Sequence, residues 1–176
     1  DSASRGLGDV YKRQINYCIL RYFNIAGSSP SGKIGLINKS DHLFKNFSRE
    51  IIKKRPILKI YGGNYDTKDG SCIRDFIHVS DIAEIHYKVL EKINKLNNSK
   101  TLNCGYNKGI SVLEVAKTFK KQTSKKVEIF ISKRRKGDLV KIIASNSKLK
   151  NFIKWKPKFN NLNTIVKSCI NWEKRQ

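Results

Sequence analysis

The side chains best able to do polar chemistry gather between residues 60 and 86. Thr67, Asp69, Arg74 and Asp75 lie close together in one expected loop of this stretch. An arginine held beside a loop carboxylate can present its guanidinium group to a phosphate, because the planar fork matches phosphate oxygens. The spacing by itself leaves two interpretations open. The loop either binds phosphate or is a turn made rigid by an internal ion pair.

A second basic segment, Arg134-Arg135-Lys136-Gly137-Asp138, lies further along the chain. In such a loop Arg135 can contact a phosphate, and Asp138 can accept a hydrogen bond from a ribose hydroxyl or hold the arginine. Taken alone, the segment is first interpreted as an exposed basic turn. Its position downstream of the first loop is what gives it interest.

Short apolar strands and amphipathic helices alternate around these segments, which indicates an α/β fold. The apolar run YCILRYFNIAG is typical of a strand buried on both faces of a parallel sheet. Its carboxyl end, where such sheets bind ligands, holds Tyr22, Phe23 and Asn24. Further strands are expected at 58–61, 101–104 and 127–132, and helices at 42–54, 111–122, 145–155 and 161–173.

One more helix is expected after the first loop, with Ser80 or Asp81 as its N-cap. Apolar residues recur in it at helical spacing and predict an inward face that includes Leu90. The helix at 42–54 should likewise turn Ile52 inward and stop before Pro56. Ser111 is expected to cap the helix that follows it, with Glu114 completing a capping box.

The composition is strongly basic, with 37 Lys and Arg against 14 Asp and Glu and a formal net charge of +23. The lysines are scattered and do not form an arginine-rich arm, which argues against nucleic acid as a partner. A positive field also suits a diphosphate ligand, so the charge alone does not decide the function.

The four cysteines are far apart and form no C-x-x-C pair, so neither a structural zinc site nor a disulfide framework is indicated. No metal site is expected. No apolar run is long enough to cross a membrane and no secretion signal is present, so we expect a cytoplasmic protein. Residues 1–14 lack apolar periodicity, and SRGLGDVYKRQ resembles the translation of a sequencing adapter; we expect them to be non-native and the protein portion to span 15–176.

The first loop resembles a known signature. Its pattern, Tyr65-x-Thr67-x-Asp69-Gly70-Ser71-x-x-Arg74-Asp75-Phe76-Ile77-His78-Val79-x-Asp81-Ile82-Ala83, is similar to that of the UDP-glucose 4-epimerases, members of the extended short-chain dehydrogenase/reductase group. The LRYFN and RRKGD segments also match this family. The resemblance implies a partial Rossmann-like parallel sheet plus the smaller C-terminal substrate-binding domain of an extended short-chain dehydrogenase/reductase.

The resemblance also assigns expected roles to individual positions. It places Tyr22 and Phe23 near the nicotinamide of NAD, and Ile142 where some members carry a tyrosine bordering the sugar. The expected contacts to the UDP-sugar come from several segments: Asn24, His42, Leu43, Lys59, Ile60, Tyr61, Arg74, Arg135, Asp138 and Ile142.

The resemblance covers only the C-terminal half of the family. No glycine-rich dinucleotide turn is found, and no tyrosine has a lysine four residues later, so no catalytic residue is expected here. The implied parent interconverts UDP-glucose and UDP-galactose by NAD-mediated oxidation and re-reduction at C4, as a homodimer, and this chain alone is expected to be inactive. The alternatives are another UDP-sugar epimerase or decarboxylase, acting on N-acetylhexosamine or glucuronate substrates, and a non-catalytic basic binding module.

Overall fold

The apolar run that begins near residue 16 forms two strands, not one. The computed structural model describes residues 16–37, 42–93, 96 and 98–176, and there β1 (Cys18–Tyr22) and β2 (Asn24–Ala26) are separated at Phe23. β1 pairs in parallel with β6 (Lys100–Cys104), and β2 pairs in parallel with β5 (Phe76–His78). Residues 1–14, which we expect to be non-native, lie outside the described residues.

Burial differs between these two strand pairs. All of β5 is buried and β2 is at least half-buried, whereas β1 exposes Ile19 and Tyr22. The prediction of one strand buried on both faces is therefore wrong for β1. Hydrophobicity selected the extended conformation, but packing partners decide which part of it is enclosed.

Two further groups of strands are present besides the β1–β6 and β2–β5 pairs. β3 (Ile57–Tyr61) pairs in parallel with β8 (Glu128–Ser132). β4 (Ile73–Arg74) lies between β7 (Ile110–Ser111), which is antiparallel to it, and β9 (Lys141–Ile142), which is parallel. This pairing brings the segment after Arg135 back beside Arg74.

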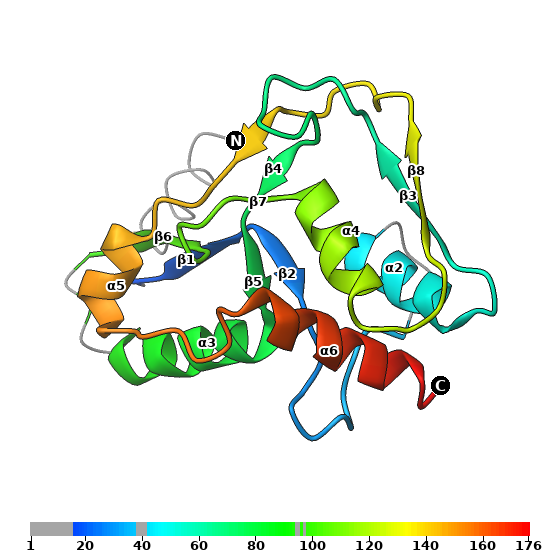
Figure 1. Cartoon of the computed structure of the whole chain (residues 1–176). Coiled ribbons are helices and arrows are strands. Elements are labelled where there is room, and N and C mark those ends of the chain that lie inside the picture. Colours follow the sequence, from blue (N-terminus) through cyan, green and yellow to red (C-terminus); the bar gives the residue numbers. More distant parts are fainter. Residues whose placement is uncertain (1–15, 38–41, 94–95, 97) are drawn as a thin grey trace, which may run out of the picture.

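Five helices are described: α2 (Leu43–Ile52), α3 (Val79–Ile93), α4 (Val112–Lys120), α5 (Ser147–Ile153) and α6 (Leu162–Glu173). In Figure 1, α3 and α6 lie below the central strands, α2 and α4 lie beside them, and α5 is at the opposite end from β3 and β8. α2 packs against α6 and α4. No helix in the described part of the chain is long and apolar enough to cross a membrane.

An aromatic cluster fixes α2 and α4 against the central strands. The ring of Phe44 meets those of Phe76 and Phe119 edge to face, with centroids 5.0 and 5.6 Å apart, and Phe47 meets Phe119 at 5.6 Å. Edge-to-face packing is favourable because the positive ring edge faces a negative ring face. The cluster holds α2 in place, and the first turns of α2 form part of the site described below.

Some predicted helix details are wrong. α3 begins at Val79, so Ser80 and Asp81 lie inside its first turn and neither is the N-cap. The Ser80 backbone N–H instead donates to Nδ1 of His78 at 3.1 Å. Leu90 and Ile52 are 66% and 39% exposed, so neither faces the core. The Ser111 cap is confirmed, because its hydroxyl accepts from the Glu114 backbone N–H at 3.0 Å.

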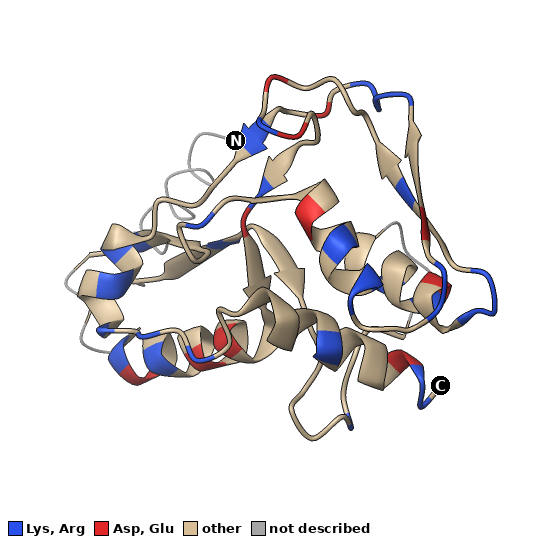
Figure 2. Ribbon diagram, in the orientation of Figure 1, with Lys and Arg blue, Asp and Glu red and all other residues tan. Residues whose placement is uncertain are grey.

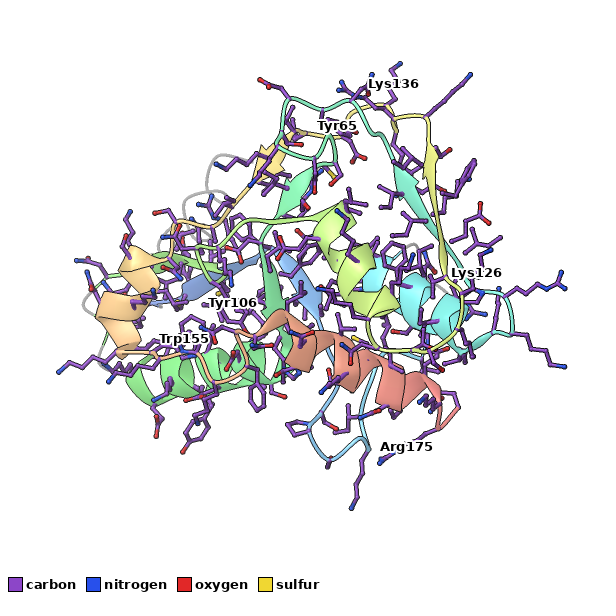
Figure 3. All side chains as sticks on the ribbon, in the orientation of Figure 1. Tyr65, Tyr106, Lys126, Lys136, Trp155 and Arg175 are labelled. Atoms are coloured by element: carbon purple, nitrogen blue, oxygen red, sulfur yellow. The ribbon has the colours of Figure 1, made fainter. Side chains whose placement is uncertain are left out.

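Two fully buried carboxylates from the first motif join distant segments. Asp75 accepts from the backbone N–H groups of Tyr106, Asn107 and Ala144 at 2.9 to 3.1 Å. The second, Asp81, accepts from the Tyr106 hydroxyl and from two backbone N–H groups that precede α6. Figure 3 labels Tyr106 and Trp155, whose rings stack with centroids 6.1 Å apart. These carboxylates are therefore structural, since buried acceptors with several donors order the loops around them.

Candidate functional site

One cavity of about 300 Å³ collects nearly all the residues predicted to contact a ligand. We call it the arginine cavity, after Arg74 and Arg135. Every predicted substrate-binding residue except Ile142 lines it: Asn24, His42, Leu43, Lys59, Ile60, Tyr61, Arg74, Arg135 and Asp138. They come from β2, the start of α2, β3, β4 and the loop after β8, which meet only in the folded chain.

A cation and an aromatic ring stack at one end of the arginine cavity. The guanidinium carbon of Arg135 lies 3.8 Å from the centroid of the Tyr61 ring, and Nζ of Lys59 lies 5.0 Å from it. Hydrogen bonding from Arg135 is the largest cause that lowers the pKa of Tyr61; burial opposes it, and the charges of Lys59 and Arg135 add to it. This end offers a flat ring and positive charge together, which suits a planar base next to an anion.

Arg74 is held from several sides. Its Nη1 donates to the carbonyls of Ile73 and Leu139 at 2.9 and 2.8 Å, and its Nη2 lies 3.7 Å from Oδ1 of Asp138. The expectation that Asp75 or Asp69 holds Arg74, or that Asp138 holds Arg135, is therefore wrong. Asp138 reaches Arg74 because β9 lies alongside β4. The side chain of Arg74 is only 11% exposed, so its direction into the cavity is fixed before any ligand binds.

The loop carboxylate Asp69 has a different role from the one its spacing suggested. It accepts from the backbone N–H and hydroxyl of Ser71, and from the hydroxyl of Ser111, the cap of α4. Burial works in the opposite direction, but these hydrogen bonds hold the pKa of Asp69 below its usual range. Asp69 thus fastens the loop to α4 and positions Arg74 indirectly.

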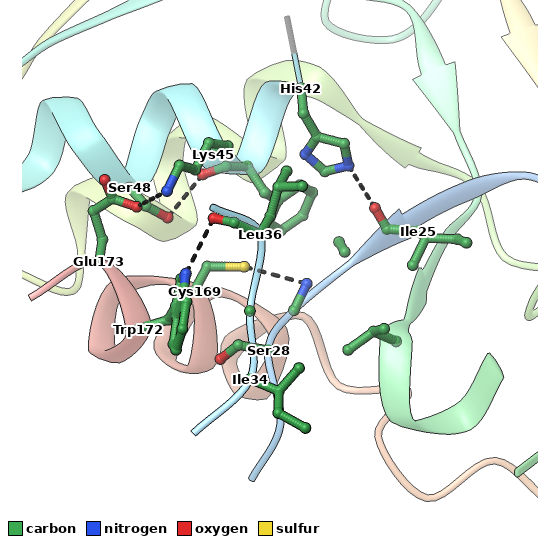
Figure 4. A pocket seen from close by; sticks show the side chains of 15 residues that line it. Ile25, Ser28, Ile34, Leu36, His42, Lys45, Ser48, Cys169, Trp172 and Glu173 are labelled. Carbon is green, nitrogen blue, oxygen red and sulfur yellow. Dashed lines mark hydrogen bonds and ion pairs between the residues drawn. The ribbon is translucent and has the colours of Figure 1, made fainter. Parts of the chain in front are cut away.

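His42 forms the other end of the arginine cavity and is shared with a second cavity. Its Nε2 lies 2.5 Å from the Ile25 carbonyl oxygen, so Nε2 carries the proton and Nδ1 is an acceptor in the neutral ring. Nδ1 is buried and has no hydrogen-bond partner in the described chain. Figure 4 shows the second cavity, of about 350 Å³, bounded by His42, the Lys45–Glu173 ion pair and Trp172.

Tyr22, Phe23 and Ile142 do not line the arginine cavity. The Tyr22 hydroxyl contacts Nε2 of His86 on α3 at 2.5 Å, and its side chain is 47% exposed. Ile142 lies in β9 opposite Arg74. Phe23 is half-buried between β1 and β2.

Sequence reasoning missed five residues that line the arginine cavity: Asn46, Phe47, Cys72, Phe76 and Val112. Asn46 and Phe47 lie one helical turn beyond His42 and Leu43, a spacing that places them on the same face of α2. Cys72 and Phe76 flank Arg74 at two residues' distance, the period of a strand. Both periodicities were visible in the sequence. Val112 had no comparable signal, since its place depends on β7 pairing with β4.

The arrangement can bind an anion joined to a planar group, but it does not form a complete dinucleotide site. A dinucleotide needs a glycine-rich turn from a strand directly into a helix, so that backbone N–H groups approach the pyrophosphate. In the described residues, the glycines with positive φ are Gly27, Gly32, Gly62, Gly70 and Gly137, and none opens a helix directly after a strand. The described residues therefore do not provide the pyrophosphate-binding turn of a nicotinamide dinucleotide site.

Comparison with known proteins points to one family. Residues 7–105, more than half of the chain, match the NAD dependent epimerase/dehydratase family. A UDP-glucose 4-epimerase of Azospirillum brasilense is 40% identical over 157 residues, covering 89% of this chain and 45% of the relative. One from Halalkalibacterium halodurans is 39% identical, covering 91% and 48%. The chain thus spans about half the length of these curated relatives.

Solved structures agree on the fold. UDP-glucose 4-epimerase of Bifidobacterium longum, in complex with NAD+ and UDP, superposes with a TM-score of 0.84 at 30% identity, over 98% of this chain and 52% of that one. The UDP-Glc/GlcNAc 4-epimerase of Campylobacter jejuni is 42% identical, with a TM-score of 0.71, over 92% of this chain and 49% of that one. The chain belongs to the NAD dependent epimerase/dehydratase family, and its fold is the α/β fold of these enzymes.

Proposed function

We propose that this chain forms the sugar-nucleotide-binding part of a UDP-hexose 4-epimerase that interconverts UDP-glucose and UDP-galactose. The observation that carries the proposal is the convergence of Arg74, Arg135 and Tyr61 on one cavity. Two cations beside an aromatic ring suit the diphosphate and uracil of a UDP-sugar. The similarity to UDP-glucose 4-epimerases supports the same substrate class.

Each part of the cavity has an expected task toward the substrate. Arg135 and Arg74 bind the diphosphate, and Asp138 accepts from a ribose hydroxyl while keeping Arg74 in place. Tyr61 offers its ring to the base, with Lys59 and Ile60 beside it, and Asn24, His42 and Leu43 contact the sugar. Tyr22 and Phe23 border the nicotinamide. When bound there, NAD would supply the hydride chemistry at C4 of the sugar. We expect its main binding residues and the general base in the remainder of the intact enzyme.

UDP binding to the 176-residue chain, measured by calorimetry, tests this proposal. Arg135→Ala and Arg74→Ala each remove a charge-assisted hydrogen bond to phosphate and should weaken UDP binding about tenfold or more. Arg134→Ala is the matched control. Arg134 stacks on Tyr65 with its guanidinium carbon 4.0 Å from the ring centroid and lies outside the cavity lining, so its loss should change UDP affinity little.

If the folded chain binds no UDP, either the pocket needs the remainder of the enzyme or the site assignment is wrong. A fusion protein separates these two explanations. Joining residues 15–176 to the N-terminal half of the Azospirillum brasilense relative should restore conversion of UDP-galactose to UDP-glucose. Activity in the fusion that is insensitive to Arg74→Ala and Arg135→Ala would contradict the assignment of these residues. A folded but inactive fusion would contradict the proposed reaction.

An N-acetylated substrate is a second candidate. The Campylobacter jejuni relative, 42% identical, is named a UDP-Glc/GlcNAc 4-epimerase. Ile142, which we place at the sugar, is smaller than the tyrosine that some members have there. The active fusion with Ile142→Tyr should lose more activity on UDP-N-acetylglucosamine than on UDP-glucose. Equal losses would remove Ile142 as a selectivity residue. The UDP-glucuronate epimerase structures are only 22% identical and support the fold alone.

The remaining expectations belong to the intact protein. We place the enzyme in the cytoplasm, as a homodimer whose contact helices belong to the part of the family that this chain does not cover. Nucleic acid is not an expected partner. Figure 2 shows Lys and Arg spread over most elements and not gathered on one of them, which supports solvated faces over a basic binding module.

A further inference from the structure

A third cavity, of about 300 Å³, lies between the loop after β2 and helix α6. We call it the α6 cavity; its polar lining side chains include His78, Lys167, Ser168 and Arg175. It shares no residue with the arginine cavity, and none of its lining residues carries a carboxylate. Two cations in the lining of a concave site create a positive potential that favours an anion, although the buried carboxylate of Asp81 lies behind His78 and Phe159.

The protonation state of His78 makes it a hydrogen-bond donor toward this cavity. His78 is 1% exposed, and its Nδ1 accepts from the Ser80 backbone N–H at 3.1 Å. The neutral ring therefore carries its proton on Nε2. Burial lowers the pKa of His78, although the charge of Asp81 opposes this, so the ring is neutral near pH 7.

Among the residues that the structure describes, the Nε2–H of His78 has one hydrogen-bond contact, and it is long. It faces the Ser168 hydroxyl oxygen at 3.4 Å, beyond the usual length of such a hydrogen bond. That hydroxyl already donates to the Ile165 carbonyl at 2.7 Å and accepts from the Ser28 backbone N–H at 3.1 Å. The serine is thus held by its own helix and the β2 loop, and a ligand oxygen could make a better acceptor for His78.

Arg175 and Lys167 supply positive charge to the lining of the α6 cavity. Arg175, labelled in Figure 3, uses Nη1 to donate to the carbonyls of Ser31 and Gly32 at 3.1 and 2.8 Å. These bonds fix the guanidinium beside the cavity, and its Nη2 and Nε make no hydrogen bond within the described part of the chain. Lys167, on the exposed side of α6, has no ion-pair partner among the described residues.

We propose that the α6 cavity is a second binding site, for a small tetrahedral oxyanion such as phosphate, which accepts from His78 Nε2–H and is neutralised by Arg175 and Lys167. The site is separate from the arginine cavity and does not depend on the function proposed there. Its donors come from β5, from α6 and from the residues after α6, so a bound oxyanion would join the C-terminal helix to the central strands.

Inorganic phosphate, titrated into the full 176-residue chain at constant ionic strength, tests this site. The probe is the imidazole of His78 in two-dimensional NMR, which is resolvable because the chain has three histidines. The Nε2 and Cε1–H signals of His78 should shift and saturate. Lys167→Gln should weaken the response about fivefold, a magnitude expected for one exposed charge. Lys174→Gln changes an exposed lysine directly after α6 that does not line the cavity; it is the matched control and should leave the response unchanged.

Arg135→Gln separates this site from the arginine cavity. It should remove phosphate binding there without affecting the His78 response, and UDP should not reproduce that response. A His78 signal that stays unchanged with phosphate would overturn the proposal. A response that chloride reproduces, that Arg135→Gln abolishes, or that survives Lys167→Gln at full strength would overturn it as well.

Discussion

β1 and β2 come from one continuous apolar run, yet the fold treats them differently. The β2–β5 pair is enclosed: Ile77 is 0% exposed and Phe76 is 3% exposed. The β1–β6 pair is open on one side, with Ile19 and Tyr22 both 47% exposed. The difference teaches that apolar composition decides where strands form, whereas helices packed against them decide which strands become core. The arginine cavity adjoins the enclosed pair, through Asn24 and Phe76.

The largest expected effect comes from the same deletion in both strand pairs. Ile77→Ala should lower the free energy of unfolding by about 3 kcal/mol, because it removes buried methyl groups and leaves a cavity. Ile19→Ala should lower the free energy of unfolding by about 1 kcal/mol or less, because Ile19 is already about half exposed to solvent in the folded chain. Urea unfolding of both variants measures the difference. Equal losses would show that β1 is as enclosed as β5. If Ile77→Ala does not fold, Ile77→Val and Ile19→Val make the same comparison at smaller cost.

A smaller effect is expected from an exposed lysine that has unusual partners. The Nζ of Lys125 donates to the carbonyls of Ile52 and Lys53, each at 2.8 Å, at the C-terminal end of α2. These carbonyls have no hydrogen-bond donor within the helix, and they bear the partial negative charge at the C-terminal end of the helix dipole. Lys125→Ala should destabilise the chain by about 1 kcal/mol, whereas Lys126→Ala, an exposed neighbour, should have almost no effect. If the two variants have the same thermal midpoint, the hydrogen bonds of Lys125 do not contribute to stability, and exposure alone explains the small loss.

The third effect concerns pH and the buried end of β5. Burial lowers the pKa of His78 from its ordinary value of 6.5, so the unfolded chain binds a proton more readily than the folded one. The stability contribution of neutral His78 is therefore complete above about pH 6.5 and is lost as pH falls from there toward the lowered folded pKa. His78→Asn should reduce the slope of stability against pH in this window. An unchanged slope would assign the acid sensitivity to other groups.

Much of the site follows from local sequence. The residue types of the first loop and of RRKGD identified Arg74, Arg135 and Asp138. Helical spacing predicted the helix that begins near His42, and the resemblance to the 4-epimerases assigned His42 and Leu43 to the site. Extending the same periods by one step would have added Asn46, Phe47, Cys72 and Phe76. The element pattern also gave the α/β class, since alternation of apolar residues is encoded within each segment.

Long-range pairing decided the remainder. Asp138 contacts Arg74 and not Arg135, because β9 lies beside β4, and no local pattern specifies that neighbour. Asp75 holds the backbones of Tyr106 and Ala144 instead of an arginine, because burial makes unpaired N–H groups costly and directs the carboxylate to them. The sequence by itself therefore determined the strands, the helices and the chemistry available to the site. Only the tertiary structure decided which charges meet and which strands are enclosed, because burial and ion pairing depend on segments distant in the chain.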